Sequence, residues 1–203
     1  GYSRRLVPFF ASHPYARLIV LSKCSRVGNL MGLESKGRTI LSWSVSPAEV
    51  WRRYEPGTPP PGERLAAMRR CGEAGYRLRA VVMPILLVEG WREAYAAMLA
   101  ELLAIASLEE VTLGSVCSFP NAIRLMEKKL GSQDELCQLL SCSCQSADGR
   151  YRFSRQERVQ CYGFLRNEIR DRRPNLKVAL CLEEQEVVQQ TGLESSIGQC
   201  NCM

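Results

Sequence analysis

Runs of apolar, often β-branched residues alternate along the chain with stretches that carry apolar residues at helical spacing. The apolar runs predict buried strands, because strands of a parallel sheet are covered on both faces and show little polar alternation. They lie at residues 17–23, 39–45, 78–87, 110–116 and 177–182. The stretches between them predict helices, including 63–74, 91–105 and 154–172. Strands and helices that alternate over short loops indicate an α/β fold with parallel β/α repeats and right-handed crossovers.

Two of the predicted helices begin with capping signals. Ser46 is expected as the N-cap of a short helix, with Pro47 in its first position and Glu49 completing a capping box. Ser154 and Glu157 form a second capping box before residues 154–172. In the first case a proline-rich loop follows directly and ends the helix.

Polar residues stand at the points where the predicted strands end. Lys23 closes the first strand, Ser44 and Ser46 close the second, and Pro84 is expected to end the third near Met83. In parallel α/β folds the carboxyl ends of the strands meet at one edge, and ligands bind there. These residues are therefore candidates for binding a ligand that bears a carboxylate or an amine.

Two segments depart from the alternating pattern. Residues 132–153 are rich in serine and cysteine and predict a loop excursion, and residues 184–203 predict a polar tail. The expected organisation is thus β/α units over 1–131, the Cys-rich loop, a last helix and strand over 154–183, and the tail. Each of these two segments contains a cysteine pair of the form C-x-C, and the two pairs together could ligate a soft metal. These candidate ligands are Cys142, Cys144, Cys200 and Cys202.

Composition narrows the class of protein. The 203 residues are 46% hydrophobic and 24% charged, as in ordinary globular domains. No apolar run approaches the roughly 20 residues that span a bilayer, so no membrane association is expected. The ten cysteines are not spaced like a secreted disulfide scaffold, which favours reduced thiols in the cytoplasm or an organelle stroma. The net charge of +6 is compatible with a nucleic-acid partner, and a monomer is expected.

Several common catalytic designs have no matching motif. Neither a G-x-G-x-x-G nor a G-x-x-x-x-G-K-[ST] sequence follows any predicted strand. His13 is the only histidine and falls in a predicted turn, so Ser-His-Asp and Cys-His mechanisms have no evident base. Lys23 remains as a carboxylate-binding cation or, alternatively, as a Schiff-base amine.

A set of short motifs resembles the spore photoproduct lyase family of radical S-adenosylmethionine enzymes over about residues 3–131. The set comprises Gly37-Arg38-Thr39 through Ser44, Tyr54-Glu55-Pro56-Gly57-Thr58, Gly75-Tyr76, Met83-Pro84-Ile85 and Glu89-Gly90-Trp91. Pro174-Asn175 and the strand after it fit the last strand of the family. The resemblance implies the C-terminal part of a partial (β/α)6 TIM-like barrel.

The resemblance also implies a function and its cofactors. In the family a [4Fe-4S] cluster reduces S-adenosylmethionine to a 5′-deoxyadenosyl radical, which abstracts hydrogen from a thymine dimer photoproduct in DNA, and the dimer then splits. By position, Lys23 matches a lysine near the S-adenosylmethionine carboxylate, Ser44 matches a serine that lines this cofactor, and Met83 matches a backbone contact. DNA repair, with DNA as the partner, is the implied role.

The chain also departs from the family pattern. The cluster motif C-x-x-x-C-x-x-C does not occur among the ten cysteines, and the family's hydrogen-donor cysteine falls before the matched region. Both are expected upstream of Gly1, so no catalytic residue is assigned and this chain alone is expected to be inactive. Residues 142–149 replace the aromatic and basic stretch that the lyase places against its lesion. A radical enzyme with another substrate, a non-catalytic basic barrel that binds nucleic acid or metal, and an aldolase that uses Lys23 remain alternatives.

Overall fold

A parallel sheet of six strands forms the centre of the computed structural model, which describes residues 1–141 and 143–195. The strands run in the order β1-β2-β3-β4-β8-β9, and every neighbouring pair is parallel. They are β1 (Leu18–Ser22), β2 (Thr39–Ser44), β3 (Arg77–Ile85), β4 (Leu108–Ser115), β8 (Lys177–Leu180) and β9 (Glu194–Ser195). The expected α/β fold with parallel β/α repeats is confirmed.

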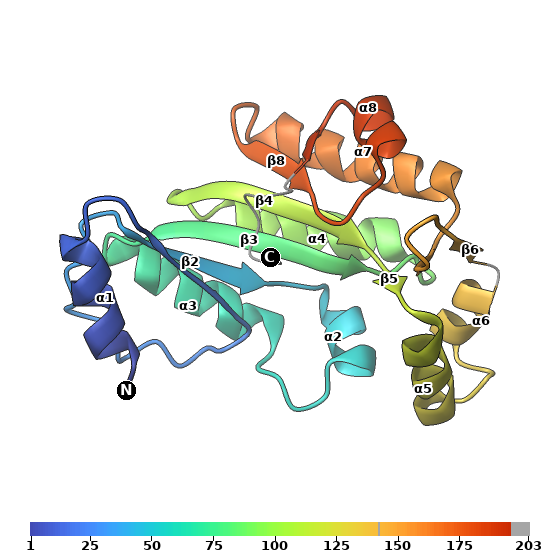
Figure 1. Cartoon of the computed structure of the whole chain (residues 1–203), viewed down its shortest axis with the longest axis horizontal. Helices are drawn as coiled ribbons and strands as arrows, with labels where there is room; N and C mark the ends of the chain where they lie inside the picture. Colours follow the sequence, from blue (N-terminus) through green and yellow to red (C-terminus); the bar gives the residue numbers. More distant parts are fainter. Residues whose placement is uncertain (142, 196–203) are drawn as a thin grey trace.

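Helices connect these strands and pack beside them (Figure 1). They are α1 (Ser3–Ser12), α2 (Ala48–Tyr54), α3 (Pro61–Glu73), α4 (Trp91–Leu103), α5 (Pro120–Leu130), α6 (Glu135–Ser141), α7 (Arg155–Arg172) and α8 (Gln185–Thr191). A small antiparallel sheet of β5 (Cys117–Ser118), β7 (Tyr151–Arg152) and β6 (Cys144–Gln145) lies beyond the end of β4. Within the described part of the chain, no helix is both long enough and apolar enough to cross a membrane.

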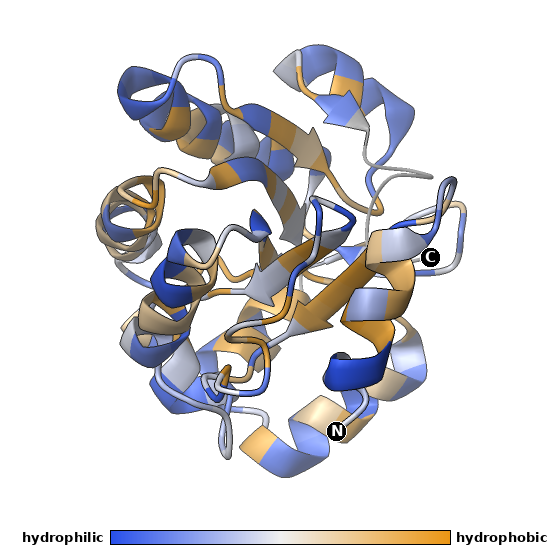
Figure 2. Ribbon diagram, turned by 90° about the vertical axis from the view of Figure 1, so that its left-hand side faces the viewer, coloured by the Kyte–Doolittle hydropathy of each residue, from blue (hydrophilic) through white to orange (hydrophobic). Residues whose placement is uncertain are grey.

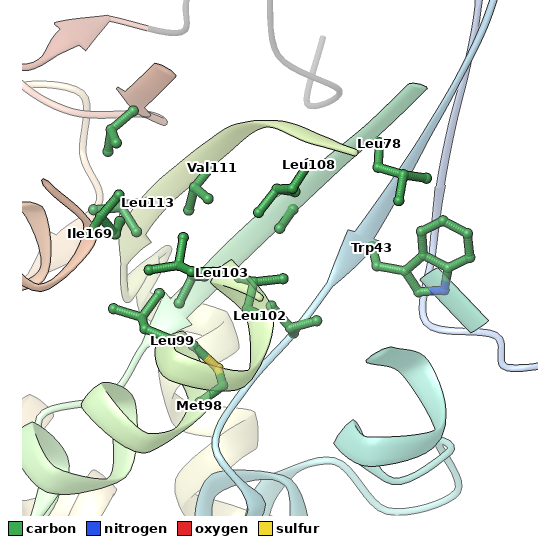
Figure 3. Packing of buried hydrophobic residues seen from close by; sticks show 14 of the residues in the cluster. Trp43, Leu78, Met98, Leu99, Leu102, Leu103, Leu108, Val111, Leu113 and Ile169 are labelled. Carbon is green, nitrogen blue, oxygen red and sulfur yellow. The ribbon is translucent and has the colours of Figure 1, made fainter. Parts of the chain in front are cut away.

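The main hydrophobic core lies between the sheet and its covering helices. Leu99 and Leu102 of α4 are fully buried, and they belong to the same cluster as Val111 and Leu113 of β4 (Figure 3). Hydropathy colouring shows strands that are mostly hydrophobic and helices that carry both kinds of residue (Figure 2). The strands that contribute to this core carry polar residues at their carboxyl ends, such as Ser44 of β2 and Ser115 of β4.

The first predicted strand exists, but the expectation that it is buried was wrong. Among the described strands β1 pairs only with β2, so it forms an edge of the sheet. Ile19, Val20 and Leu21 are 40%, 37% and 44% exposed. An apolar run therefore predicted the strand correctly, whereas its position in the sheet depends on pairing that the run does not encode.

The two irregular segments contain more structure than expected. Residues 132–153 hold α6 and the short strands β6 and β7, and the expected tail holds α8 and β9, which adds a sixth strand. These elements are only two to seven residues long, too short to show a clear periodicity. Strand β3 also continues two residues past Met83 to Ile85, because a register shift in its pairing with β4 accommodates Pro84.

Candidate functional site

The polar residues predicted at the strand ends gather at one edge of the sheet. Ser44 is the last residue of β2, and its hydroxyl donates a hydrogen bond to the Met83 carbonyl of β3 at 3.5 Å. Lys23 directly follows β1, and its ammonium lies 3.0 Å from a carboxylate oxygen of Glu55. The three residues that the resemblance assigned to S-adenosylmethionine therefore share this edge, as parallel strands require.

Glu55 lies at the centre of the site, and sequence reasoning gave it no role. Its side chain is 9% exposed and accepts hydrogen bonds from the Ser46 hydroxyl at 2.8 Å and from Arg64 Nη2 at 2.7 Å. Burial raises the pKa of the Glu55 carboxyl, but hydrogen bonds from Arg64, Ser46 and Lys23 outweigh it and hold the pKa below its usual value. Glu55 is therefore a buried carboxylate that fixes the position of the Lys23 ammonium.

Arg64 is a fully buried cation that holds this arrangement together. Besides Glu55, its guanidinium donates to the Ser44 carbonyl at 3.1 Å, the Pro59 carbonyl at 2.8 Å and the Thr58 hydroxyl at 2.7 Å. A buried charge is tolerated when it is paired and its remaining protons are bonded, as is the case for Arg64. Arg64 thus ties the proline-rich loop, and Glu55 within it, to the end of β2.

Ser46 does not cap α2, contrary to the sequence-based expectation. The helix begins at Ala48 with Pro47 in the N-cap position, and no side chain caps it. The Ser46 hydroxyl instead donates to Glu55, because a carboxylate removed from water needs donors more than an exposed helix end does. The capping box predicted for Ser154 and Glu157 is confirmed at the start of α7.

Glu55 gives the fold a measurable pH dependence. Its pKa is lower in the folded than in the unfolded chain, so the stability it contributes is present above its ordinary pKa of 4.5 and is lost as the pH falls through the folded value. In Glu55→Gln this contribution is absent at every pH. Urea unfolding at several pH values should therefore show wild type losing more stability than Glu55→Gln below about pH 4.5. Parallel pH profiles for the two proteins would contradict this assignment.

The residues at this edge suit the amino-acid end of S-adenosylmethionine. The Lys23 side chain is 36% exposed, so its ammonium can bind a second carboxylate while it keeps its bond to Glu55. The Ser44 hydroxyl oxygen and the Met83 carbonyl to which it donates offer lone pairs at the same edge of the sheet. The donor set therefore fits a ligand with a free carboxylate.

An iron–sulfur cluster does not fit the described part of the chain. Residues 1–141 and 143–195 contain no group of three or more cysteine, histidine or acidic side chains that could hold a metal. Cys144 is exposed on β6, whereas Cys142, Cys200 and Cys202 lie outside the described residues, so the proposed C-x-C metal site stays a prediction. No chemical step is therefore assigned to a cluster held by these residues.

A second buried polar cluster lies where β4 and β8 end, and sequence reasoning missed it. The Glu183 side chain is 2% exposed, pairs with Arg158 and accepts a hydrogen bond from the Tyr162 hydroxyl at 2.8 Å. The same hydroxyl accepts the Ser115 backbone N–H at 2.7 Å. Arg158 and Tyr162 lie on one face of α7, and only the acidic pair after the last predicted strand offered a signal for the cluster.

Comparisons with known proteins agree with this arrangement. The family model for spore photoproduct lyase matches residues 1–116. The chain is 33% identical over 99 residues to spore photoproduct lyase of Geobacillus sp., and 32% over 92 residues to that of Bacillus subtilis. These matches cover 49% and 45% of this chain but only 29% and 27% of the relatives. The chain thus matches less than a third of their length.

Solved structures of spore photoproduct lyase have the same fold. A variant with bound AdoMet (S-adenosylmethionine) and dinucleoside spore photoproduct superposes with a TM-score of 0.76 at 26% identity. A complex with dinucleoside spore photoproduct superposes with a TM-score of 0.74 at 25% identity. Each alignment covers 86% of this chain and 54% of the solved one. Together with the family model over more than half of the sequence, these matches show that the chain belongs to the spore photoproduct lyase family.

Proposed function

We propose that this chain is the part of a radical S-adenosylmethionine lyase that binds the cofactor's amino-acid end and faces a thymine photoproduct in DNA. The observation that carries the proposal is the Lys23–Glu55–Arg64 network at the strand ends beside Ser44. It provides a fixed, partly exposed cation in a chain that belongs to the lyase family. A solved relative with AdoMet bound supports the same choice of cofactor.

In this proposal the protein's own residues bind and orient the cofactor. The Lys23 ammonium binds the cofactor's carboxylate, and Glu55 keeps that ammonium at the strand ends rather than in solvent. The Ser44 hydroxyl and the Met83 carbonyl fix the orientation of the bound molecule. When bound in a radical enzyme, S-adenosylmethionine supplies the 5′-deoxyadenosyl radical that starts the repair.

DNA is the proposed substrate. The net charge of +6 favours a polyanion, and solved relatives hold a dinucleoside spore photoproduct. The proposal assigns the cluster to residues other than those of this sequence, because C-x-x-x-C-x-x-C does not occur in it. Function as a monomer is part of the same proposal.

The Schiff-base alternative has weaker support from the geometry. A Schiff-base lysine needs a side-chain nitrogen that is free to attack a carbonyl. The Lys23 nitrogen instead lies in an ion pair with the mostly buried Glu55 carboxylate. A carboxylate-binding role is compatible with that ion pair.

Anaerobic reconstitution with iron and sulfide tests the proposal. The 203-residue chain and a version extended through the upstream sequence of its gene are each supplied with S-adenosylmethionine and dinucleoside spore photoproduct. The extended protein is expected to hold a reducible cluster, to release 5′-deoxyadenosine and to restore thymidine, whereas the shorter chain does none of these. Failure of the extended protein to form 5′-deoxyadenosine would refute the radical mechanism, and 5′-deoxyadenosine without thymidine would refute the substrate.

A further inference from the structure

A groove of about 750 Å³ runs beside the candidate site, between α2, the end of β3 and α5. Tyr54 and Pro56 form part of one wall, on either side of Glu55 in the sequence, and Pro84 follows Met83 in the same lining. Figure 1 shows α2 and α5 at the end of the molecule toward which β2 and β3 point. The groove therefore lies at the same end of the molecule as the edge where the cofactor is proposed to bind, and sequence neighbours of the site residues line it.

The α5 wall of the groove is an apolar face with little cover. None of the eleven residues of α5, all of them described, is buried, although a surface helix normally buries one face. Leu125 and Leu130 line the groove and are 62% and 39% exposed. Exposed apolar surface that rims a groove is typical of a binding site.

Exposed cations on α5 indicate that the occupant of the groove is negatively charged. Arg124, Lys128 and Lys129 are exposed, and the structure gives none of them an ion pair within its described residues. Arg53 on the opposite wall is already paired with Asp134 at 3.4 Å and with Glu135 at 2.8 Å. Glu127 on the same helix is exposed and also has no ion pair among the described residues, so the net unneutralised charge along α5 is positive, and Lys129 carries it into the groove lining.

An exposed aromatic ring stands at the start of this helix. Phe119 is 53% exposed, and the Arg150 guanidinium lies 5.1 Å from its ring centroid. Aromatic side chains next to a positively charged groove are how proteins bind single-stranded nucleic acid, since every unpaired base has a face that can stack. Paired and stacked bases of a duplex offer no such face.

We propose that α5, Phe119 and the groove beside them bind an unpaired stretch of DNA next to the cofactor site. Arg124, Lys128 and Lys129 contact the phosphates, Phe119 stacks on a base, and the groove takes a neighbouring base. Its volume suits this role, because small-molecule sites are roughly 300–1,000 Å³. The inference rests on the proposed function, since it identifies the surface that holds DNA beside the site.

Fluorescence anisotropy with a labelled oligothymidylate at several salt concentrations tests the inference. The variant Arg124→Ala/Lys128→Ala/Lys129→Ala should bind more weakly, and its plot of log K against log [salt] should be shallower by about 2, at about 0.7 for each lost phosphate contact. Phe119→Ala should lose roughly tenfold in affinity. The matched control Arg4→Ala/Arg5→Ala/Arg69→Ala removes the same charge from α1 and α3 and should leave the slope nearly unchanged.

The outcomes separate this inference from the proposed function. An α5 variant and a Phe119→Ala protein that bind as wild type does, or a control variant that loses as much affinity, would overturn the inference. A wild type that prefers duplex DNA to oligothymidylate, or that binds neither, would overturn it too. Titration of the same preparations with S-adenosylmethionine tests the proposed function independently, because no substituted residue lies in the cofactor site. Thermal unfolding of each variant confirms that it is folded.

Discussion

Replacing Arg64 with leucine is expected to lower the free energy of unfolding by about 3–5 kcal/mol, the usual cost of removing one partner from a buried ion pair. The substitution removes the guanidinium from a fully buried position and leaves the mostly buried Glu55 carboxylate without its closest cation. It also leaves the Ser44 carbonyl without this donor. Urea unfolding followed by circular dichroism measures the change, with the m-value expected to stay constant.

Arg69→Leu is the matched control, because Arg69 lies on the same helix with its side chain exposed. It should change the unfolding free energy by no more than about 0.5 kcal/mol. A loss below about 1 kcal/mol in Arg64→Leu would show that the network does not hold the loop in place. Equal losses in the two variants would contradict the assignment as well.

Lys23→Ala is expected to weaken the binding of S-adenosylmethionine by at least about tenfold. A hydrogen bond to a charged group contributes about 1.5–3 kcal/mol, and about 1.4 kcal/mol corresponds to a factor of ten. Stability should change little, because the Lys23 side chain is 36% exposed and exposed ion pairs contribute about 0–1 kcal/mol. Isothermal titration calorimetry measures the affinity.

Lys128→Ala removes the same charge from α5 and should leave the affinity for S-adenosylmethionine unchanged. Lys23→Arg keeps the charge and should retain more affinity than Lys23→Ala. Unchanged binding in Lys23→Ala would remove Lys23 from the cofactor site. Equal loss of affinity in Lys23→Ala and Lys128→Ala would show that the effect comes from the overall charge of the protein and not from a contact of Lys23 with the cofactor.

Local sequence was enough to place the sheet and most of the large helices. Strand β2 could be predicted because all six of its residues are buried, and a strand that is covered on both faces consists of apolar and small residues without polar alternation. The position of β1 could not, because an edge strand and a central strand can share the same sequence. Alignment of strand ends at one edge follows from parallel pairing, which is why Lys23, Ser44 and Met83 were predicted to lie together.

The network that holds these residues in place was not predictable from spacing. Glu55 and Arg64 come from a loop and a helix, and their contact depends on how the proline-rich loop folds back over β2. Ser46 shows the same limit, since its sequence context indicated a helix cap while the folded chain uses its hydroxyl for a buried carboxylate. At this position the hydrogen bond that a buried carboxylate needs replaces the helix cap that the local sequence favours.

The proposed function requires the ends of β1, β2 and β3 to bind the amino-acid portion of S-adenosylmethionine. Calorimetric titration of the wild-type chain with S-adenosylmethionine and with 5′-deoxyadenosine, which lacks that portion, measures this binding. Saturable binding of S-adenosylmethionine at a single site is expected, at least about tenfold tighter than that of 5′-deoxyadenosine. Equal affinities, or no saturable binding of S-adenosylmethionine, would contradict it.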